Sequence, residues 1–246
     1  MAKKNFYDIY HIKPVLQKKI IDKNNFTYKN VLNVVGRYCS GRNRILDIGC
    51  GVGTIDFFFA KKGKTIDGID ISENAMKIAS ENAKLFGLTK RLAFRKMDFP
   101  NEFPKQKYDF IICSEVVEHL VKDEWAIKKF HRLLRNKGRV FISTPSESSV
   151  LFRLGLTKKH DKWAGHLRRY TTERLTGLLK NSGFKIIYTA KREGVLRESL
   201  FIFPFLGIIV KLANRFAFIG NLITYIDNFL LKIFGESDIE IVAEKI

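Results

Sequence analysis

Short apolar runs alternate with helical patterns from residue 44 onward, and this alternation restricts the possible folds more than any other feature of the chain. Runs typical of buried strands cover 45–48, 65–70, 92–96, 108–113, 139–143, 184–189 and 239–243. Helical patterns cover 54–62, 73–86, 124–134 and 172–182. Strands that alternate with helices form βαβ units, so we expect an α/β domain with a parallel sheet and helices on both faces.

The composition is typical of one packed domain with an appended element. Of the 246 residues, 46% are hydrophobic, which is enough for a core and excludes global disorder. The 44 basic and 25 acidic residues leave a net charge of +19, which attracts nucleic acid, anionic lipid headgroups or an acidic substrate without choosing among them. Three cysteines and a start without an apolar signal-peptide core predict a protein of the reducing cytoplasm.

The first predicted strand ends in a glycine-rich turn. Asp47 is followed by glycines at alternate positions, Gly49, Gly51 and Gly53. Glycines let the backbone turn tightly and approach a ligand, and the next helix would present its N-terminal amides to that ligand. Ligands of parallel sheets bind beyond the carboxyl ends of the strands, so this turn is a candidate binding loop.

The next two strands also end in acids. Asp70 ends the second strand, where a carboxylate can accept both hydroxyls of a ribose; helix capping is the alternative, because Ser72 follows. Asp98 ends the third strand beside Phe99, a pair suited to the amine and ring of adenine, although alone it would be an ordinary surface turn. Three such features at consecutive strand ends favour a nucleoside-containing ligand.

Four segments together resemble the ordered motifs of class I S-adenosylmethionine-dependent methyltransferases: 47–53, 68–72, 97–99 and 113–120. The resemblance covers about residues 40–190 and the last strand. It implies a Rossmann-like, doubly wound sheet of seven strands, mostly parallel with an antiparallel last strand. The glycine spacing is GxGxG, which disfavours the dinucleotide fingerprint GxGxxG.

The resemblance implies S-adenosyl-L-methionine as the cofactor. The glycines would border its methionine moiety, with Asp47 near the amino group, and Asp70 would hold the ribose hydroxyls. Asp98 and Phe99 would hold the adenine. The expected cofactor-binding residues are Asp47, Gly49, Gly51, Gly53, Asp70, Ile71, Asp98, Phe99 and Ser114.

An ExxEH array follows the fourth strand. A helical turn starting at Glu115 would place it on one face with Glu118 and His119. These side chains suit Mg²⁺, Mn²⁺ or Zn²⁺, with His166, or secondarily His160, as a fourth ligand. The pattern resembles ubiquinone-pathway O-methyltransferases and small-RNA 2′-O-methyltransferases, in which such an array binds a divalent ion; the region after the fifth strand matches neither.

Two other roles for this array stay open. His119 or His166 could be the catalytic group, acting as a general base without a metal. Alternatively, Glu115 is only part of the pocket wall and the remaining pair, Glu118 and His119, starts a helix.

Residues 163–170 could form a structural lid between the fifth strand and the next helix. Arg168 and Arg169 within this segment could hold a phosphate, although a solvated surface is the default for such a pair.

An apolar insertion, residues 193–236, separates the sixth and seventh strands, which the family joins by a short connection. Residues 200–210 carry no charge, and an apolar stripe at helical spacing over 211–234 predicts one helix that is apolar on more than one face. A membrane-interface patch with basic residues at anionic headgroups is one interpretation. A packed hairpin or dimer interface is another; charged residues such as Lys211 and Asp227 disfavour a spanning helix.

The chain thus divides into an N-terminal helical cap (1–43), a cofactor-binding core (44–192), the apolar helical insertion (193–236) and the last core strand (237–246). We expect a methyltransferase that O-methylates a hydrophobic small molecule or lipid, in the cytoplasm or peripherally on the cytoplasmic membrane face. An RNA methyltransferase is one alternative, although the sequence has no recognisable RNA-binding domain and its extra mass is apolar. A catalytically silent cofactor-binding scaffold is the other.

Overall fold

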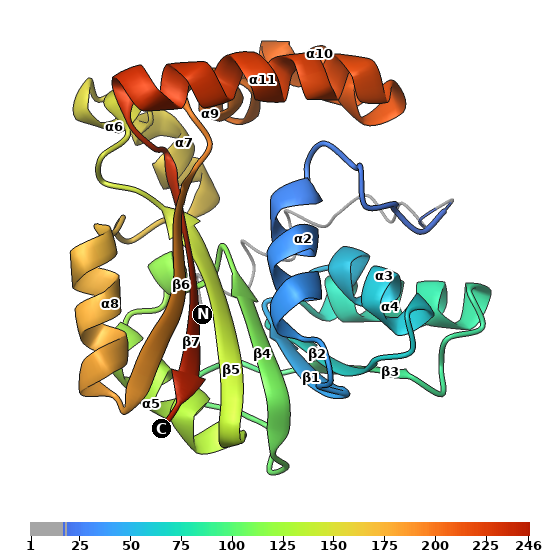
Figure 1. Ribbon diagram of the computed structural model, residues 1–246. Helices are drawn as coiled ribbons and strands as arrows, with labels where there is room; N and C mark the ends of the chain where they lie inside the picture. The colour runs from blue at the N-terminus through green and yellow to red at the C-terminus, as the bar shows by residue number, and fades with distance from the viewer. Residues whose placement is uncertain (1–16, 18) are drawn as a thin grey trace.

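The computed structural model describes residues 17 and 19–246, and a seven-stranded sheet forms its centre (Figure 1). The strands follow the spatial order β3-β2-β1-β4-β5-β7-β6. β7 pairs antiparallel with β5 and β6, and the other described pairings are parallel, which confirms the predicted doubly wound sheet. The strands are β1 (Arg44–Ile48), β2 (Thr65–Asp70), β3 (Leu92–Lys96), β4 (Tyr108–Ser114), β5 (Leu134–Pro145), β6 (Phe184–Arg192) and β7 (Asp238–Lys245).

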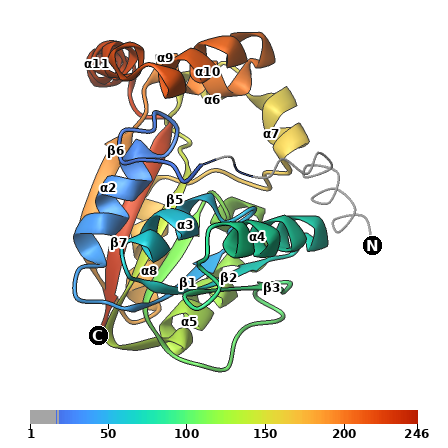
Figure 2. The same ribbon diagram turned by 90° about the vertical axis from the view of Figure 1, so that its right-hand side faces the viewer.

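Helices cover both faces of the sheet (Figures 1 and 2). One face carries α2 (Lys29–Tyr38), α3 (Thr54–Lys61) and α4 (Glu73–Leu85), and the other carries α5 (Asp123–Leu133) and α8 (Thr172–Asn181). The predicted N-terminal cap is represented by α2, while residues 1–16 and 18 of that cap lie outside the described residues.

The inner strands of the sheet are mostly buried on both faces, because they send alternate side chains into two cores, whereas the edge strands β3 and β6 are partly exposed. In β4, Ile111 and Cys113 join the core shared with α5 and α8. The alternate residues, Phe110 and Ile112, point to the other face and join the core beneath α2 and α3. Burial on both sides is the reason why these strands are nearly continuous apolar runs in the sequence.

The helices after β5 differ from the sequence prediction. Two short helices, α6 (Val150–Arg153) and α7 (Lys158–Ala164), occupy a stretch for which none was predicted. The single helix predicted over 211–234 is wrong: α10 (Gly207–Arg215) and α11 (Ala217–Phe234) are separated by the extended backbone of Phe216. The break lets α11 fold back against α10, where Gly220 lies so close that a Cβ would stand 3.1 Å from a carbonyl oxygen of α10.

The insertion forms a layer across the carboxyl ends of the strands (Figure 1). It consists of α9 (Val195–Ile202), the short 3-10 turn η2 (Pro204–Leu206), α10 and α11. Asp227 of α11 fastens this layer internally, because its carboxylate accepts hydrogen bonds from the backbone N–H groups of Gly194 (2.7 Å) and Arg197 (2.9 Å) at the start of α9. The layer therefore covers the edge of the sheet at which ligands of such folds bind.

Candidate functional site

The glycine-rich loop between β1 and α3 has a backbone that only glycine adopts without strain. Gly49, Gly51 and Gly53 have φ values of 73°, 52° and 80°. Space is equally restrictive, because a Cβ on Gly49 would lie 2.3 Å from a methyl group of Val116. Gly49 and Gly51 line the central pocket, whereas Gly53 is the N-cap of α3 and packs toward Phe94. The loop thus forms a cradle that places backbone atoms at the pocket wall.

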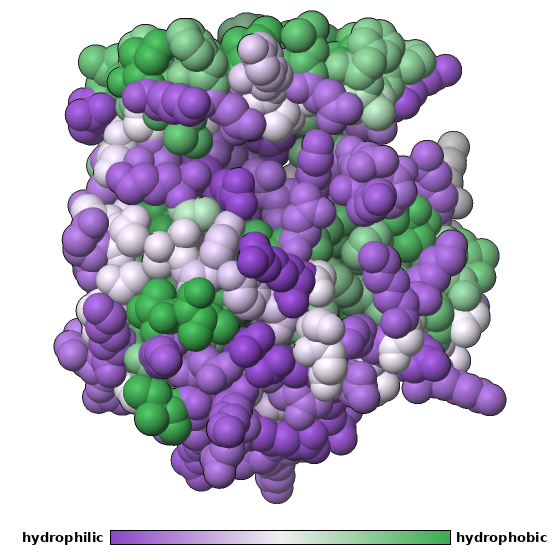
Figure 3. Space-filling model, in the orientation of Figure 1, coloured by the Kyte–Doolittle hydropathy of each residue, from purple (hydrophilic) through white to green (hydrophobic). Residues whose placement is uncertain are grey.

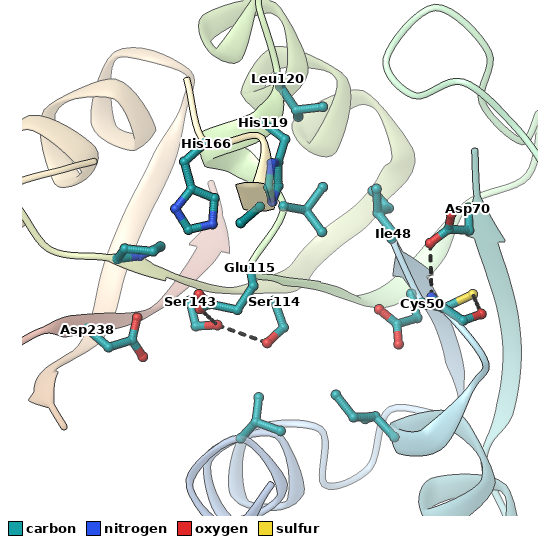
Figure 4. Close-up of a pocket in the computed structure, with 18 of the residues that line it drawn as sticks. Ile48, Cys50, Asp70, Ser114, Glu115, His119, Leu120, Ser143, His166 and Asp238 are labelled. Atoms are coloured by element: carbon teal, nitrogen blue, oxygen red, sulfur yellow. Dashed lines mark hydrogen bonds between the residues drawn. The ribbon is translucent and has the colours of Figure 1, made fainter. Parts of the chain in front are cut away.

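Asp70 holds this loop in place from the end of β2 (Figure 4). Its Oδ2 accepts a hydrogen bond from the N–H of Gly51 at 3.0 Å, and its Oδ1 accepts from the N–H of Ser72 at 2.8 Å. The carboxylate lines the pocket together with the neighbouring Ile71. Asp70 therefore organises the turn and faces the cavity, while the helix cap is Ser72, whose hydroxyl accepts from the N–H of Ala75. Contact of Asp70 with a ribose stays a prediction.

The end of β3 contributes one exposed acid and one buried ring to the pocket wall. Asp98 is exposed and accepts a hydrogen bond from the side chain of Asn101 at 3.0 Å. The ring of Phe99 is only 7% exposed and stacks on Phe130, with 5.5 Å between ring centroids. Contact of this ring with adenine stays a prediction, and the structure gives the ring a core-packing role as well.

Asp47 is buried at the pocket wall beside a second acid that the sequence analysis missed. Asp56 lies in the first turn of α3 and is fully buried. Burial raises the pKa of Asp56 to about 7, and burial together with the charge of Asp56 raises the pKa of Asp47 well above its ordinary value. Asp47 lines the cavity and Asp56 does not, and the two raised pKa values favour retention of a proton by the pair. An acid within the apolar sequence Ile55–Ala60 was the available signal.

Three side chains converge beyond β4: Glu118 and His119 in the 3-10 turn η1 (Val117–His119), and His166 after α7. The Nε2 atoms of His119 and His166 lie 3.8 Å and 4.0 Å from Oε1 of Glu118. That oxygen is buried and has no hydrogen-bond partner among the described residues, whereas Oε2 accepts from Thr144 at 3.0 Å. The arrangement leaves one carboxylate oxygen and two ring nitrogens facing a common point, as in a site for a divalent cation.

Both imidazoles are held through their other ring nitrogen. Nδ1 of His119 lies 3.1 Å from the carbonyl oxygen of Gly165, and Nδ1 of His166 lies 3.0 Å from the carboxylate of Asp161. Such contacts keep the proton on Nδ1 and leave Nε2 as the acceptor. Figure 4 shows both rings above the pocket.

Glu115 does not join this cluster, so the predicted helical face shared by Glu115, Glu118 and His119 is wrong. The 3-10 turn starts only at Val117, and Glu115 before it has a left-handed backbone with φ 55°. Its carboxylate instead accepts a hydrogen bond from Ser143 at 2.8 Å, and that hydroxyl lies 2.9 Å from the hydroxyl of Ser114 (Figure 4). Burial raises the pKa of Glu115 to about 7.

Asp161 of α7 is the main positioning residue that the sequence analysis missed. It contacts Nδ1 of His166, accepts from the hydroxyl of Thr157 at 2.7 Å and pairs with Arg169 at 2.9 Å. Burial opposes ionisation of Asp161, but the histidine, arginine and threonine contacts keep its pKa well below the ordinary value. Arg169 also pairs with Glu198 of α9 at 3.0 Å, so the insertion is connected to the histidine cluster.

The arginine pair after α7 is structural, and the solvated surface considered as its default is wrong. Arg169 is 4% exposed and fully engaged by its two acids. Arg168 lies 3.0 Å from the carboxylate of Asp123 and donates to the carbonyl of Leu120 at 2.7 Å. The pair therefore closes the segment after α7 onto the domain.

One cavity of about 810 Å³ connects these parts. Its lining includes the predicted cofactor residues other than Gly53, together with Glu115, His119, His160 and His166, while Glu118 lies behind the two histidines. Apolar side chains from three separate elements complete the wall: Val31 of α2, Trp163 of α7, and Phe201 and Ile202 of α9. A polar cradle and an apolar chamber thus share one space beneath the insertion.

Known proteins match both the sequence and the fold. A family model for a methyltransferase domain matches residues 22–189. Ubiquinone biosynthesis O-methyltransferases from Pseudomonas syringae and Aeromonas salmonicida are 32% and 35% identical to the chain over 104 residues. Those matches cover 41% of this chain and 44% and 42% of the relatives, so the chain spans less than half the length of these curated relatives.

Solved structures match more of the chain at lower identity. Magnesium protoporphyrin IX methyltransferase from Synechocystis, with bound SAH, has a TM-score of 0.65 at 15% identity and covers 100% of this chain and 99% of its own. Phosphoethanolamine N-methyltransferase 2 from Haemonchus contortus, in complex with S-adenosyl-L-methionine, has a TM-score of 0.65 at 17% identity, covering 89% of this chain and 52% of its own. At these identities the similarity establishes the fold.

Proposed function

Since the chain belongs to the methyltransferase domain family and has the fold of class I S-adenosylmethionine-dependent methyltransferases, we propose that it transfers a methyl group to a hydroxyl oxygen of a hydrophobic acceptor. The observation that carries the proposal is the shared cavity, in which the glycine cradle and the histidine cluster open onto the same space. The names of the ubiquinone-pathway relatives support oxygen as the acceptor atom.

The residues of the cradle fit S-adenosyl-L-methionine. Asp47 lines the cavity as a buried acid for its ammonium group, Asp70 faces the cavity with a carboxylate suited to ribose hydroxyls, and Asp98 is the exposed acid for the adenine amine. When bound, the cofactor supplies an electrophilic methyl group. The contribution of the chain is to hold donor and acceptor in line, which converts binding energy into proximity and orientation.

The cluster of Glu118, His119 and His166 gives the acceptor hydroxyl a place to lose its proton. The partnerless oxygen of Glu118 and the two Nε2 atoms fit a divalent cation such as Mg²⁺ or Zn²⁺, which would lower the pKa of a coordinated hydroxyl. Without a cation, Nε2 of either imidazole is a proton acceptor facing the cavity. The metal route uses all three side chains, whereas the metal-free route uses one imidazole; wherever His166 takes part, Asp161 orients it.

The apolar chamber selects for a hydrophobic acceptor. Trp163, Phe201 and Ile202 form a wall that would remain in contact with water unless an apolar molecule covered it.

The proposed compartment is the reducing cytoplasm. The free cysteines among the described residues are compatible with it.

Transfer of labelled methyl groups to a series of hydroxyl-bearing acceptors of increasing apolar character tests this function directly. We expect cofactor-dependent O-methylation by the wild type, and loss of at least about tenfold in kcat/KM for Glu118→Gln and for His166→Ala, because each removes one group of the proton-accepting cluster. His131→Gln, which alters a histidine outside the cavity, is the matched control.

Metal binding needs a readout separate from turnover. Titration with Co²⁺, followed by visible absorption, should give a spectrum of histidine-ligated metal in the wild type and in His131→Gln, and not in His166→Ala. If the spectrum is absent but His166→Ala still abolishes transfer, the imidazole acts as a general base without metal. Unchanged transfer in both cluster variants would contradict the proposed role, and labelling of RNA rather than small molecules would favour the nucleic-acid alternative.

A further inference from the structure

We propose that the outer face of α10 and α11 is a docking surface for an anionic lipid bilayer. This apolar platform is made by large side chains that are 58–77% exposed: Ile208 of α10, Phe218, Leu222, Tyr225 and Phe229 of α11, and Phe205 of the preceding turn η2. Figure 3 shows the hydrophobic band that they form along the top of the molecule, over α10 and α11. A contiguous apolar surface of this kind marks a membrane or protein interaction site rather than ordinary surface scatter.

The orientation of α11 is the reverse of that expected for a helix on a water-exposed surface. Its acidic residue, Asp227, is 1% exposed and points inward to the amides of Gly194 and Arg197. Phe218 and Tyr225 lie on the opposite side of the helix. Phe218 comes nine residues before Asp227 and Tyr225 two residues before it, and at about 100° per residue both spacings place the ring about half a turn away from Asp227. The fold therefore buries the charge and presents the rings outward, which suits an apolar medium outside.

Charge complementarity identifies an anionic bilayer as the occupant. Lys211, Arg215 and Lys232 are exposed on α10 and α11 themselves. The adjoining segment 150–164, which lies beside this layer in both ribbon views (Figures 1 and 2), adds four more exposed bases, Arg153, Lys158, Lys159 and Lys162.

The acids of these segments do not oppose that charge. In 150–164 and 200–235 the acids are Asp161 and Asp227, and both are bound to inward-facing partners. An apolar face with exposed bases and no exposed acid matches the acyl chains and phosphate groups of an anionic leaflet. A protein partner with a dry apolar face would leave these bases without counter-charges.

Docking in the plane of the membrane fits this geometry better than crossing it. Among the described residues, α11 is the helix that is long and apolar enough to span a bilayer by length and composition. Crossing would require Asp227 to leave the two amides that it accepts from, and would carry Asp227 and Lys232 into the hydrocarbon. Lying flat preserves these bonds and buries only the platform.

The platform is the outer side of the same layer that roofs the cavity. Phe201 and Ile202 of α9 line the cavity, and α9 packs against α11 through Asp227. Docking would therefore hold the apolar chamber next to the acyl region, where hydrophobic acceptors are concentrated. This last consequence rests on the proposed function, whereas docking itself does not.

Flotation of the full chain with vesicles tests the proposal. The wild type should float with vesicles of phosphatidylcholine and phosphatidylglycerol, less with phosphatidylcholine alone, and less at high salt. The double variant Phe218→Asp/Phe229→Asp should lower the partition coefficient at least about tenfold, because two exposed rings that would enter the bilayer become two negative charges. The matched control is Leu85→Asp/Ile246→Asp, which alters exposed apolar residues away from the platform and should float like the wild type.

Cofactor binding, measured by calorimetry on the same preparations, shows that each variant is folded and separates docking from methyl transfer. Failure of the wild type to float while it binds S-adenosyl-L-methionine would overturn the docking surface and leave the proposed function standing. Equal flotation of the platform variant and the wild type would overturn it too. So would a wild-type dimer that the platform variant converts to a monomer, since the occupant would then be a second copy of the chain.

Discussion

Asp56 is a carboxylic acid with no access to solvent, and its neighbours in α3 from Ile55 to Ala60 are apolar. Its burial beside Asp47 raises its pKa from 3.8 to about 7, so the folded chain holds its proton more tightly than the unfolded chain does. The unfolded state therefore ionises first as the pH rises. The stabilising contribution of the protonated acid is complete at pH values below 3.8 and is lost as the pH rises through about 7.

Asp56→Asn should consequently be more stable than the wild type at about pH 8 and nearly equal to it at about pH 4, because the amide cannot ionise. The difference at the higher pH should reach a few kcal/mol at most. Chemical denaturation across this pH range measures it, with Glu81→Gln on the exposed side of α4 as the control. A difference in stability that does not change with pH would contradict the raised pKa.

At the scale of elements, Asp227 of α11 makes the side-chain hydrogen bonds that join this helix to α9, beside the apolar contacts of the insertion. Asp227 accepts from two backbone amides at the start of α9 and occupies the role of a capping residue supplied by another helix. Without it, those amides would be buried and unsatisfied, and an unsatisfied buried group costs about 1–3 kcal/mol. Loss of Asp227 would therefore weaken the contact between α9 and α11, because its described hydrogen bonds are made to the start of α9.

We therefore expect Asp227→Ala to lower the free energy of unfolding by about 1–3 kcal/mol. It should also speed proteolysis in the connections that flank α10. Asn228→Ala alters the next residue, which is exposed, and should stay within about 0.5 kcal/mol of the wild type. Urea denaturation and limited proteolysis of both variants measure the effect. Equal behaviour of the two variants would show that the insertion is attached by its apolar contacts alone.

At the scale of the whole molecule, the cavity connects parts that are distant in the chain. Val31 comes from the N-terminal helix, Asp47 and Asp70 from the sheet, and Phe201 from the insertion. A ligand that contacts all of them stabilises the assembly as a unit, because binding to the folded state alone shifts the unfolding equilibrium.

S-adenosyl-L-methionine at a hundred times its Kd should add about 2.7 kcal/mol to the free energy of unfolding. Thermal denaturation with and without the cofactor measures this. In Asp70→Asn the same cofactor concentration should give a smaller increase, because a charged acceptor is lost at the cradle; Glu81→Gln should respond like the wild type. An increase in Asp70→Asn as large as in the wild type would contradict the assigned position of the ribose.

Much of the fold is local in origin and was predictable. Doubly buried strands such as β4 require continuous apolar runs, and glycines at 49, 51 and 53 are required by positive φ values, so both features are written into the sequence. The parallel part of the sheet follows from that alternation. The antiparallel direction of β7 was predicted from family resemblance, since no local pattern specifies it, and its place between β5 and β6 is given by the structure.

The tertiary structure alone decided which polar groups meet. Glu118 and His119 are adjacent in sequence, but their meeting with His166 depends on α7, whose Asp161 holds that ring, and α7 was not predicted. Glu115 left the group because its backbone turns before the 3-10 turn begins. The outward face of α11 was likewise undetermined by a pattern that is apolar on more than one face; in the structure, the bonds of Asp227 set the rotation of the helix. Periodicity is a property of neighbouring residues, whereas these contacts arise from segments that only packing brings together.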